Sequence, residues 1–226
     1  MKLLALDTST DACSAALWQD GETIERFALG REHAGRILPM IEELLIEAGI
    51  ALGALDAIAF GRGPGSFTGL RIGAGVVQGL AFGADLPVVP VSTLAALAQG
   101  EAAARVLTAL DARMTQVYWG AYVRDAEGLM VLSGVEVVID PQQVPLPAGE
   151  DWHGTGSGWD RYHDVLRARL GSRVGGWRES AFPRARFVAA LGAAGLRVGR
   201  AVTAEQAVPV YLRDEVAVKT AERRKR

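Results

Sequence analysis

Apolar residues near the N-terminus fall into short runs of strand length, and after residue 32 they take up helical spacing. The pattern predicts strands over 3–6, 12–18 and 23–29. Residues 33–48 carry apolar side chains three and four positions apart, which predicts an amphipathic helix ending at Gly49. The chain is therefore expected to open with a β-meander followed by a helix.

The stretch from Gly61 to Gly83 combines a glycine-rich turn with a long, almost uncharged helix. A short apolar strand over 57–60 leads into the turn, and Ser66 or Thr68 can cap the start of the helix. This order gathers free backbone N–H groups and the positive end of a helix dipole at one point, as phosphate-binding turns do. The lysine of a phosphate-binding P-loop is absent from the turn.

The glycines of this helix need an explanation, because each interior glycine costs about 1 kcal/mol relative to alanine. At about 100° per residue, one arc of the helix holds Gly69, Gly73, Gly79 and Gly83 together with Ile72, Val76 and Leu80. Close approach of another backbone explains such an arc. The helix can be a buried core helix, one member of an intermolecular helix pair, or both.

The second half of the chain repeats the opening arrangement of strand, Asp-containing turn and strand. Strands are predicted over 87–91, 106–110, 116–123 and 129–138, with a short one around Trp152, and helices over 93–103, 159–170 and 185–198. Two related α/β domains follow, over 1–103 and 104–212. Residues 213–226 form a tail whose end is expected to be disordered.

Composition narrows the class of protein. Half of the 226 residues are hydrophobic, and 24 basic against 26 acidic residues give no global attraction to nucleic acid. Cys13 is the single cysteine, which excludes an internal disulfide. The apolar start stops at Asp7, too early for a signal peptide, and no run reaches transmembrane length. We expect a cytoplasmic protein with no membrane association.

Groups that carry chemistry are scarce. The three histidines, His33, His153 and His163, lack metal-ligand spacing, so no metal site and no set of catalytic residues is predicted. The turn Asp7, Thr8, Ser9 and Thr10 can hold phosphate or can simply be a good turn. Together with Gly63, Gly65 and Ser66 it is the candidate for a degenerate nucleotide or phosphate site. The basic tail end is either a solvated terminus or a weak contact with RNA.

Four motifs in this order resemble the TsaB family, also called YeaZ. The most specific is GPGSFTGLRIG at 63–73, and the others are LALDTST at 4–10, LDAR at 110–113 with Val117–Tyr118, and PVYLR at 209–213. The resemblance implies an actin-like, sugar-kinase-like (ribonuclease H-like) fold of two α/β domains. It also implies a cytoplasmic accessory subunit of a tRNA-modifying complex, without catalysis of its own.

The partners implied by the resemblance are the paralogous transferase TsaD and the ATPase TsaE. TsaD transfers threonylcarbamoyl to the adenosine beside the anticodon in tRNAs that read codons starting with A. Contact of this chain with tRNA is expected to be indirect or weak. A homodimer is expected when TsaD is absent. No cofactor should bind this chain tightly, and ATP or ADP would enter at the level of the complex. TsaD has a metal-binding histidine pair in the helix corresponding to 33–48, but here Ile37 follows His33 by four positions.

The family's docking surface corresponds to the two helices over 33–48 and 68–83. The residues expected to carry it are Ile37, Met40, Ile41, Leu44, Gly69, Arg71, Gly73, Val76, Val77 and Leu80. A bulky charged residue at Gly73 or Val76 is expected to abolish partner binding and leave the fold largely intact.

Two other functions are alternatives to this interpretation. An independent ATP-dependent phosphotransferase of the same fold would use the turn at Asp7 for phosphate and Asp111 as base. Ser9, however, stands where such enzymes usually have glycine. A peptidase would need a metal site or a nucleophile–base pair, and the sequence offers neither pattern.

Overall fold

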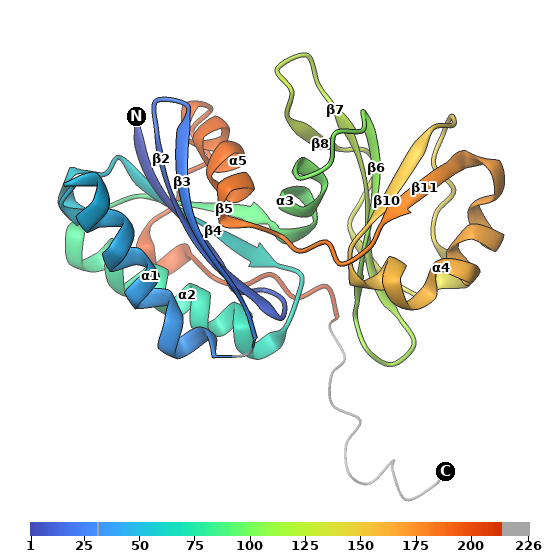
Figure 1. Ribbon diagram of the computed structural model, residues 1–226, viewed down its shortest axis with the longest axis horizontal. Helices are drawn as coiled ribbons and strands as arrows, with labels where there is room; N and C mark the ends of the chain where they lie inside the picture. Colours follow the sequence, from blue (N-terminus) through green and yellow to red (C-terminus); the bar gives the residue numbers. More distant parts are fainter. Residues whose placement is uncertain (31, 214–226) are drawn as a thin grey trace, which may run out of the picture.

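Two β-sheets lie side by side as two lobes in the structure, a computed structural model that describes residues 1–30 and 32–213 (Figure 1). The first sheet has strand order β3-β2-β1-β4-β5, and the second has order β11-β10-β6-β7-β8 with β9 paired to β7. The predicted fold class, an actin-like arrangement of two α/β units that each contain a β-meander, is confirmed.

The first sheet begins as a meander and continues in parallel. Its strands are β1 (Lys2–Asp7), β2 (Ala12–Gln19), β3 (Glu22–Leu29), β4 (Ala57–Gly63) and β5 (Val88–Ser92). The first three strands pair antiparallel because short turns join them, and Asp20 and Gly21 take positive φ at the second turn. β4 runs parallel to β1 and β5 parallel to β4, which requires helical crossovers between them.

Helices cover both faces of the first sheet (Figure 1). α1 (His33–Ala48) and α2 (Phe67–Ala84) lie on one face, where Leu4, Leu6 and Phe60 point. α5 (Ala185–Arg197) lies on the other face, against the alternate positions of the same strands. Small side chains there let the helix come close, since a Cβ added to Gly192 would lie 2.5 Å from the Ala59 Cβ.

The second sheet has one main helix, α4 (Ser157–Leu170). Its strands are β6 (Arg105–Asp111), β7 (Val117–Arg124), β8 (Met130–Leu132), β9 (Val137–Ile139), β10 (Trp152–Thr155) and β11 (Val174–Arg178). Trp119 of β7 and Trp159 of α4 are buried together, with ring centroids 6.3 Å apart. The Trp159 indole N–H donates to the Leu107 carbonyl at 2.8 Å, so the large ring is buried with its polar atom satisfied.

α3 (Thr93–Gln99) and a buried carboxylate join the two lobes. The helix packs against β4 of the first sheet and against β6 and β7 of the second. Glu136, beside β9, accepts hydrogen bonds from Ser92 of the first sheet and from Tyr122 of the second. Burial and the nearby Glu136 charge hold the pKa of the Tyr122 hydroxyl well above its ordinary value.

The lobes are not continuous segments of chain. The second domain was expected to run from 104 to 212, but α5 returns to the first sheet. Residues after α5 stay there, because Val202 pairs with Val88 in an isolated antiparallel bridge. α5 packs there because its apolar side chains bury one face of the first sheet. The expected tail, 213–226, lies outside the described residues except for Arg213.

Some local predictions differ from the structure. The strand expected over 129–138 is two strands, because Gly134 takes a positive φ of 98° and breaks the run. The helix expected over 93–103 ends at Gln99, and β11 was not predicted. Short 3-10 segments lie at Leu52–Ala54, Pro141–Gln143, Gly171–Arg173 and Ala204–Gln206. Within the described ranges, no helix is both long and apolar enough to span a bilayer.

Candidate functional site

Six of the ten residues expected on the docking surface face the protein's own core. These are Ile37, Ile41 and Leu44 of α1, and Gly69, Gly73 and Val77 of α2. The most apolar stripe of each helix is the stripe that its own sheet buries. Met40, Val76 and Leu80 are partly buried, and Arg71 is exposed. The surface that the two helices leave accessible therefore lies on their other sides.

The glycines of α2 divide into two groups. A Cβ added to Gly69 would overlap the Thr8 carbonyl oxygen, and one added to Gly73 would lie 2.5 Å from Thr8 Oγ1. These two glycines let α2 press against the end of β1. Gly75, Gly79 and Gly83 have open space where a side chain would be. A bulky residue at Gly73 would consequently disturb the fold, contrary to the expectation that the fold would tolerate it.

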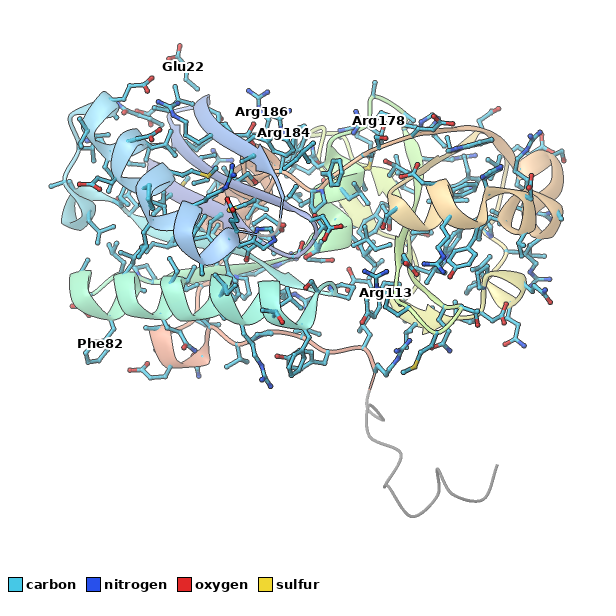
Figure 2. All side chains as sticks on the ribbon, turned by 60° about the horizontal axis from the view of Figure 1, so that its bottom comes forward. Glu22, Phe82, Arg113, Arg178, Arg184 and Arg186 are labelled. Carbon is cyan, nitrogen blue, oxygen red and sulfur yellow. The ribbon has the colours of Figure 1, made fainter. Side chains whose placement is uncertain are left out.

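The outer sides of α1 and α2 carry an exposed apolar surface. Leu38 is 49% exposed, Ile46 73% and Phe82 75%, and Figure 2 shows Phe82 pointing away from α2. A groove of about 510 Å³ lies beside α1 and is lined by Leu38, Leu45, Ile46 and neighbouring residues, with Leu80 contributed by α2. We call the exposed set Leu38, Ile46, Gly75, Gly79 and Phe82 the docking face.

None of the five residues of the docking face belongs to the ten residues expected from the sequence, although the sequence carries a signal for them. Leu38 and Ile46 stand four positions before and after Glu42, on the polar side of α1. Apolar residues on the polar side of an amphipathic helix are not needed for its own core, so they mark a surface to be covered. Gly75 and Phe82 follow the same rule on α2, where they lie opposite Val77.

The two turns expected to hold phosphate pack against each other. The Ser66 N–H donates to the Ser9 carbonyl at 2.7 Å, and a Cβ on Gly65 would overlap that same carbonyl. Thr8 Oγ1 donates to the Gly69 carbonyl at 2.8 Å, so this hydroxyl is already used. The absence of side chains on Gly65 and Gly69 thus allows the two turns to contact each other.

Gly63 has a different neighbour, the segment that carries the PVYLR motif. It takes φ of 108°, and an added Cβ would lie 2.7 Å from the Val210 carbonyl oxygen. The Val210 N–H donates to the Arg62 carbonyl at 2.8 Å. Two motifs that are far apart in sequence therefore meet in space, beside the end of β4.

Asp7 is a buried carboxyl at the centre of this packing. Its Oδ1 accepts from the Ser9 N–H at 3.0 Å and from the Ser9 hydroxyl at 2.7 Å. Its Oδ2 is buried against Gly61 without a hydrogen bond. Burial raises the pKa of Asp7 from 3.8 to about 6, although the hydrogen bonds from Ser9 and the nearby His33 oppose the rise. Thr10 is tied to α1, since its carbonyl lies 2.7 Å from His33 Nε2.

Asp111, the base of the phosphotransferase alternative, is held in ion pairs. Its Oδ2 lies 2.9 Å from Arg161 and 3.4 Å from Arg113. Among the residues that the structure describes, no group of three or more His, Cys, Asp or Glu side chains could hold a metal ion. The arrangement around Asp7 and Asp111 is thus one of internal packing and pairing.

Comparison with known proteins identifies the family. A family model described as TsaD, tRNA N6-adenosine threonylcarbamoyltransferase, matches residues 28–154. The tRNA threonylcarbamoyladenosine biosynthesis protein TsaB of Escherichia coli (strain K12) is 44% identical, and the match covers 97% of each chain. The chain belongs to the TsaB family. The protein of that name from Haemophilus influenzae is 41% identical, over 97% of this chain and 96% of its own.

Solved structures agree with membership of the TsaB family. One is described as YeaZ from Pseudomonas aeruginosa; it is 49% identical, has a TM-score of 0.87, and matches over 93% of this chain and 99% of its own. Another, described as an uncharacterized protein from Pseudomonas aeruginosa with similarity to peptidase YEAZ, has the same identity and TM-score, with coverage of 94% and 99%. The resemblance found from the four motifs is confirmed, and the TsaB family belongs to tRNA threonylcarbamoyladenosine biosynthesis.

Proposed function

We propose that this chain is a non-catalytic scaffold subunit in threonylcarbamoylation of the adenosine beside the anticodon. It binds a TsaD-like transferase through the docking face and helps to recruit a TsaE-like ATPase. A second copy of the chain covers the same face when the transferase is absent. Nucleotide enters at the level of the complex, and this chain alone binds none tightly.

One observation carries the proposal: the helix pair exposes large apolar side chains beside glycines that have open space. Ile46 and Phe82 are each about three-quarters exposed. The open stripe of Gly75 and Gly79 lets a second helix approach closely. Exposed apolar patches of this kind mark interaction surfaces in soluble proteins.

The packing of the two turns supports the non-catalytic part of the proposal. In a phosphotransferase these turns would have to leave room for phosphate, but here Gly65 and Ser66 contact Ser9 directly. The carboxyl of Asp7 is buried, and Asp111 is paired with two arginines. Neither carboxyl is presented to a substrate in this arrangement.

The docking test compares Ile46→Asp and Phe82→Asp with a matched control, Val198→Asp. Val198 is 67% exposed and follows α5, on the opposite face of the first sheet. Capture of the TsaD-like protein should weaken about 100-fold or more for the first two variants, because a charge is buried in an apolar contact. The control should bind normally, and all three should unfold at similar urea concentrations. Normal capture by Ile46→Asp and Phe82→Asp would contradict the assignment of the surface.

The functional test is deletion with complementation. Threonylcarbamoyladenosine in tRNA should disappear from the deletion strain, return with the wild-type gene and stay low with Phe82→Asp. Unchanged modification in the deletion strain would contradict the proposed function. Calorimetry with ATP and magnesium provides a separate check, because tight binding by the isolated chain would favour the phosphotransferase.

A further inference from the structure

Three segments that are distant in sequence meet where the two lobes join. They are the start of α2 with Phe67 and Arg71, the turn between β6 and β7 with Met114, and the last described residues with Tyr211 and Arg213. We call these five residues the arginine–aromatic patch. Met114 is 70% exposed, Phe67 52% and Tyr211 42%.

The two aromatic rings of the patch lie next to each other at a tilt, and both residues are partly exposed. The Arg71 guanidinium lies 3.7 Å from the centroid of the Phe67 ring, within the range of a cation–π contact. The Phe67 and Tyr211 ring centroids are 5.6 Å apart. Arg71 Nε also donates to the Tyr211 hydroxyl at 3.2 Å. These contacts hold two rings and one cation in fixed positions while leaving about half of each ring exposed.

Both arginines of the patch lack a carboxylate partner among the described residues. Arg213 bonds to Gln116 Oε1 at 2.6 Å and contacts Met114 Sδ at 3.3 Å. Arg71 contacts the Phe67 ring and the Tyr211 hydroxyl. At the opposite edge, by contrast, Arg184 and Arg186 share the carboxylate of Glu25 (Figure 2).

Neighbouring groups increase the positive charge. Arg113 and Arg161 share the single carboxylate of Asp111, which leaves one positive charge in excess. Figure 2 shows Arg113 at the junction of the lobes, close to the last described residues. The thirteen positions after Arg213 hold five basic and three acidic residues, so their sequence carries a net charge of +2. Positive charge is thus in excess among the described groups around the patch and in the sequence that follows it.

We propose that the arginine–aromatic patch binds the single-stranded loop of a tRNA directly. This inference rests on the proposed function, which brings the chain to tRNA, and it differs from the sequence-based expectation of indirect or weak contact. Unpaired bases stack on exposed aromatic rings, and unpaired arginines bind phosphates, which is how single-stranded nucleic acids are recognised. An acidic protein would use the arginines but would leave the exposed ring faces without a specific role.

The arginine–aromatic patch and the docking face share one helix. Phe67 and Arg71 begin the same helix, α2, that carries Gly75, Gly79 and Phe82 of the docking face. An RNA loop on the patch would therefore lie beside a transferase docked on the helix pair. The chain would present substrate as well as support its partner.

The test measures binding of the isolated full-length chain to a fluorescent anticodon stem–loop RNA by anisotropy, over a series of salt concentrations. Phe67→Leu keeps an apolar side chain without a ring and should weaken binding roughly 5- to 150-fold, the effect of one stacked base. Phe67→Trp should retain binding. Arg71→Gln should reduce the slope of log affinity against log salt by about 0.7, the value for one phosphate contact on a single strand.

Controls separate the patch from general electrostatics. Arg197→Gln removes the same charge from an exposed arginine that lies over Trp18 on the opposite face, and it should leave binding unchanged. A fully paired duplex of equal length should bind more weakly than the stem–loop. Replacing the last four basic residues by glutamine in the full chain measures how much the charges of the tail contribute to RNA affinity.

Several results would overturn the inference. One is the absence of binding up to about 100 μM RNA, the weak limit of non-specific association. Others are equal affinity for duplex and stem–loop, or unchanged binding by the Phe67→Leu and Arg71→Gln variants. If those variants lose capture of the ATPase or the transferase but bind RNA normally, the patch is a protein contact. Complementation stays a separate readout, because a scaffold that never touches RNA would still restore the modified nucleoside.

Discussion

The glycines on the two sides of α2 serve opposite purposes. Gly69 and Gly73 lie against Thr8, where the helix meets β1 without space for a methyl group. Gly75 and Gly79 lie along the outer side, where nothing within the described protein would touch an added side chain. The same residue type therefore marks internal packing on one side of the helix and an accessible surface on the other.

The largest effect is expected for Gly69→Ala. The added methyl group would overlap the Thr8 carbonyl, which is backbone and cannot rotate away, so the strand end or the helix must shift. We expect a loss of about 3 kcal/mol or more in the free energy of unfolding, because overpacking against backbone is at the upper end of its usual range. Urea unfolding measures this loss. A change below about 1 kcal/mol would show that the contact between α2 and β1 is loose.

The variant Asp7→Asn tests the packing on the buried side of α2, where β1 ends. Its effect on the free energy of unfolding should depend on pH. A pKa raised from 3.8 to about 6 means that the folded state binds the proton more tightly than the unfolded state. The contribution of Asp7 to stability is thus present below about pH 4 and is lost as the pH rises through about 6. Asparagine avoids that loss, so the variant should be more stable by up to about 3 kcal/mol at pH 7.5.

The advantage of Asp7→Asn should disappear toward pH 3.5, where the wild-type carboxyl is protonated in both states. Comparing variant and wild type at each pH removes the effect of the other carboxylates. A difference that stays constant from pH 4 to pH 8 would contradict the burial of an ionisable group at this position.

The smallest effect on stability is expected for Gly79→Ala. This change removes an interior glycine without any contact to disturb, so the protein should gain up to about 1 kcal/mol. Its affinity for the TsaD-like partner should fall, because the partner helix could no longer approach as closely. If Gly79→Ala destabilised the protein as much as Gly69→Ala does, the two groups of glycines would not differ in their packing.

Local features of the fold were predictable because they depend on neighbouring residues. The limits of α1, His33 to Ala48, follow from its apolar periodicity and from Gly49, which takes the left-handed conformation after the last turn. The hairpin between β2 and β3 follows from alternation and from Asp20–Gly21. Such signals are contained within a few positions of the chain.

Features set by long-range packing were not predictable in the same way. Nothing near residue 185 indicates that α5 covers the first sheet rather than the second. Periodicity also finds the apolar stripe of a helix without saying whether its own sheet or a partner buries it. For this reason periodicity selects Ile37 and Leu44, which the first sheet buries, and not Leu38 and Ile46, which are exposed. The four motifs predicted the family, because their meaning comes from resemblance rather than from packing.

The return of α5 to the first sheet has a consequence for synthesis of the chain. A ribosome makes β1 to β5 within the first 92 residues, but the helix that covers one face of that sheet is only completed at Arg197. Until then Leu3, Ala5 and Val89, buried in the finished protein, have no cover from α5. The nascent first lobe therefore carries an open apolar face while residues 93–197 are being made. A fragment ending near residue 103 should aggregate when it is expressed alone, while the full chain folds.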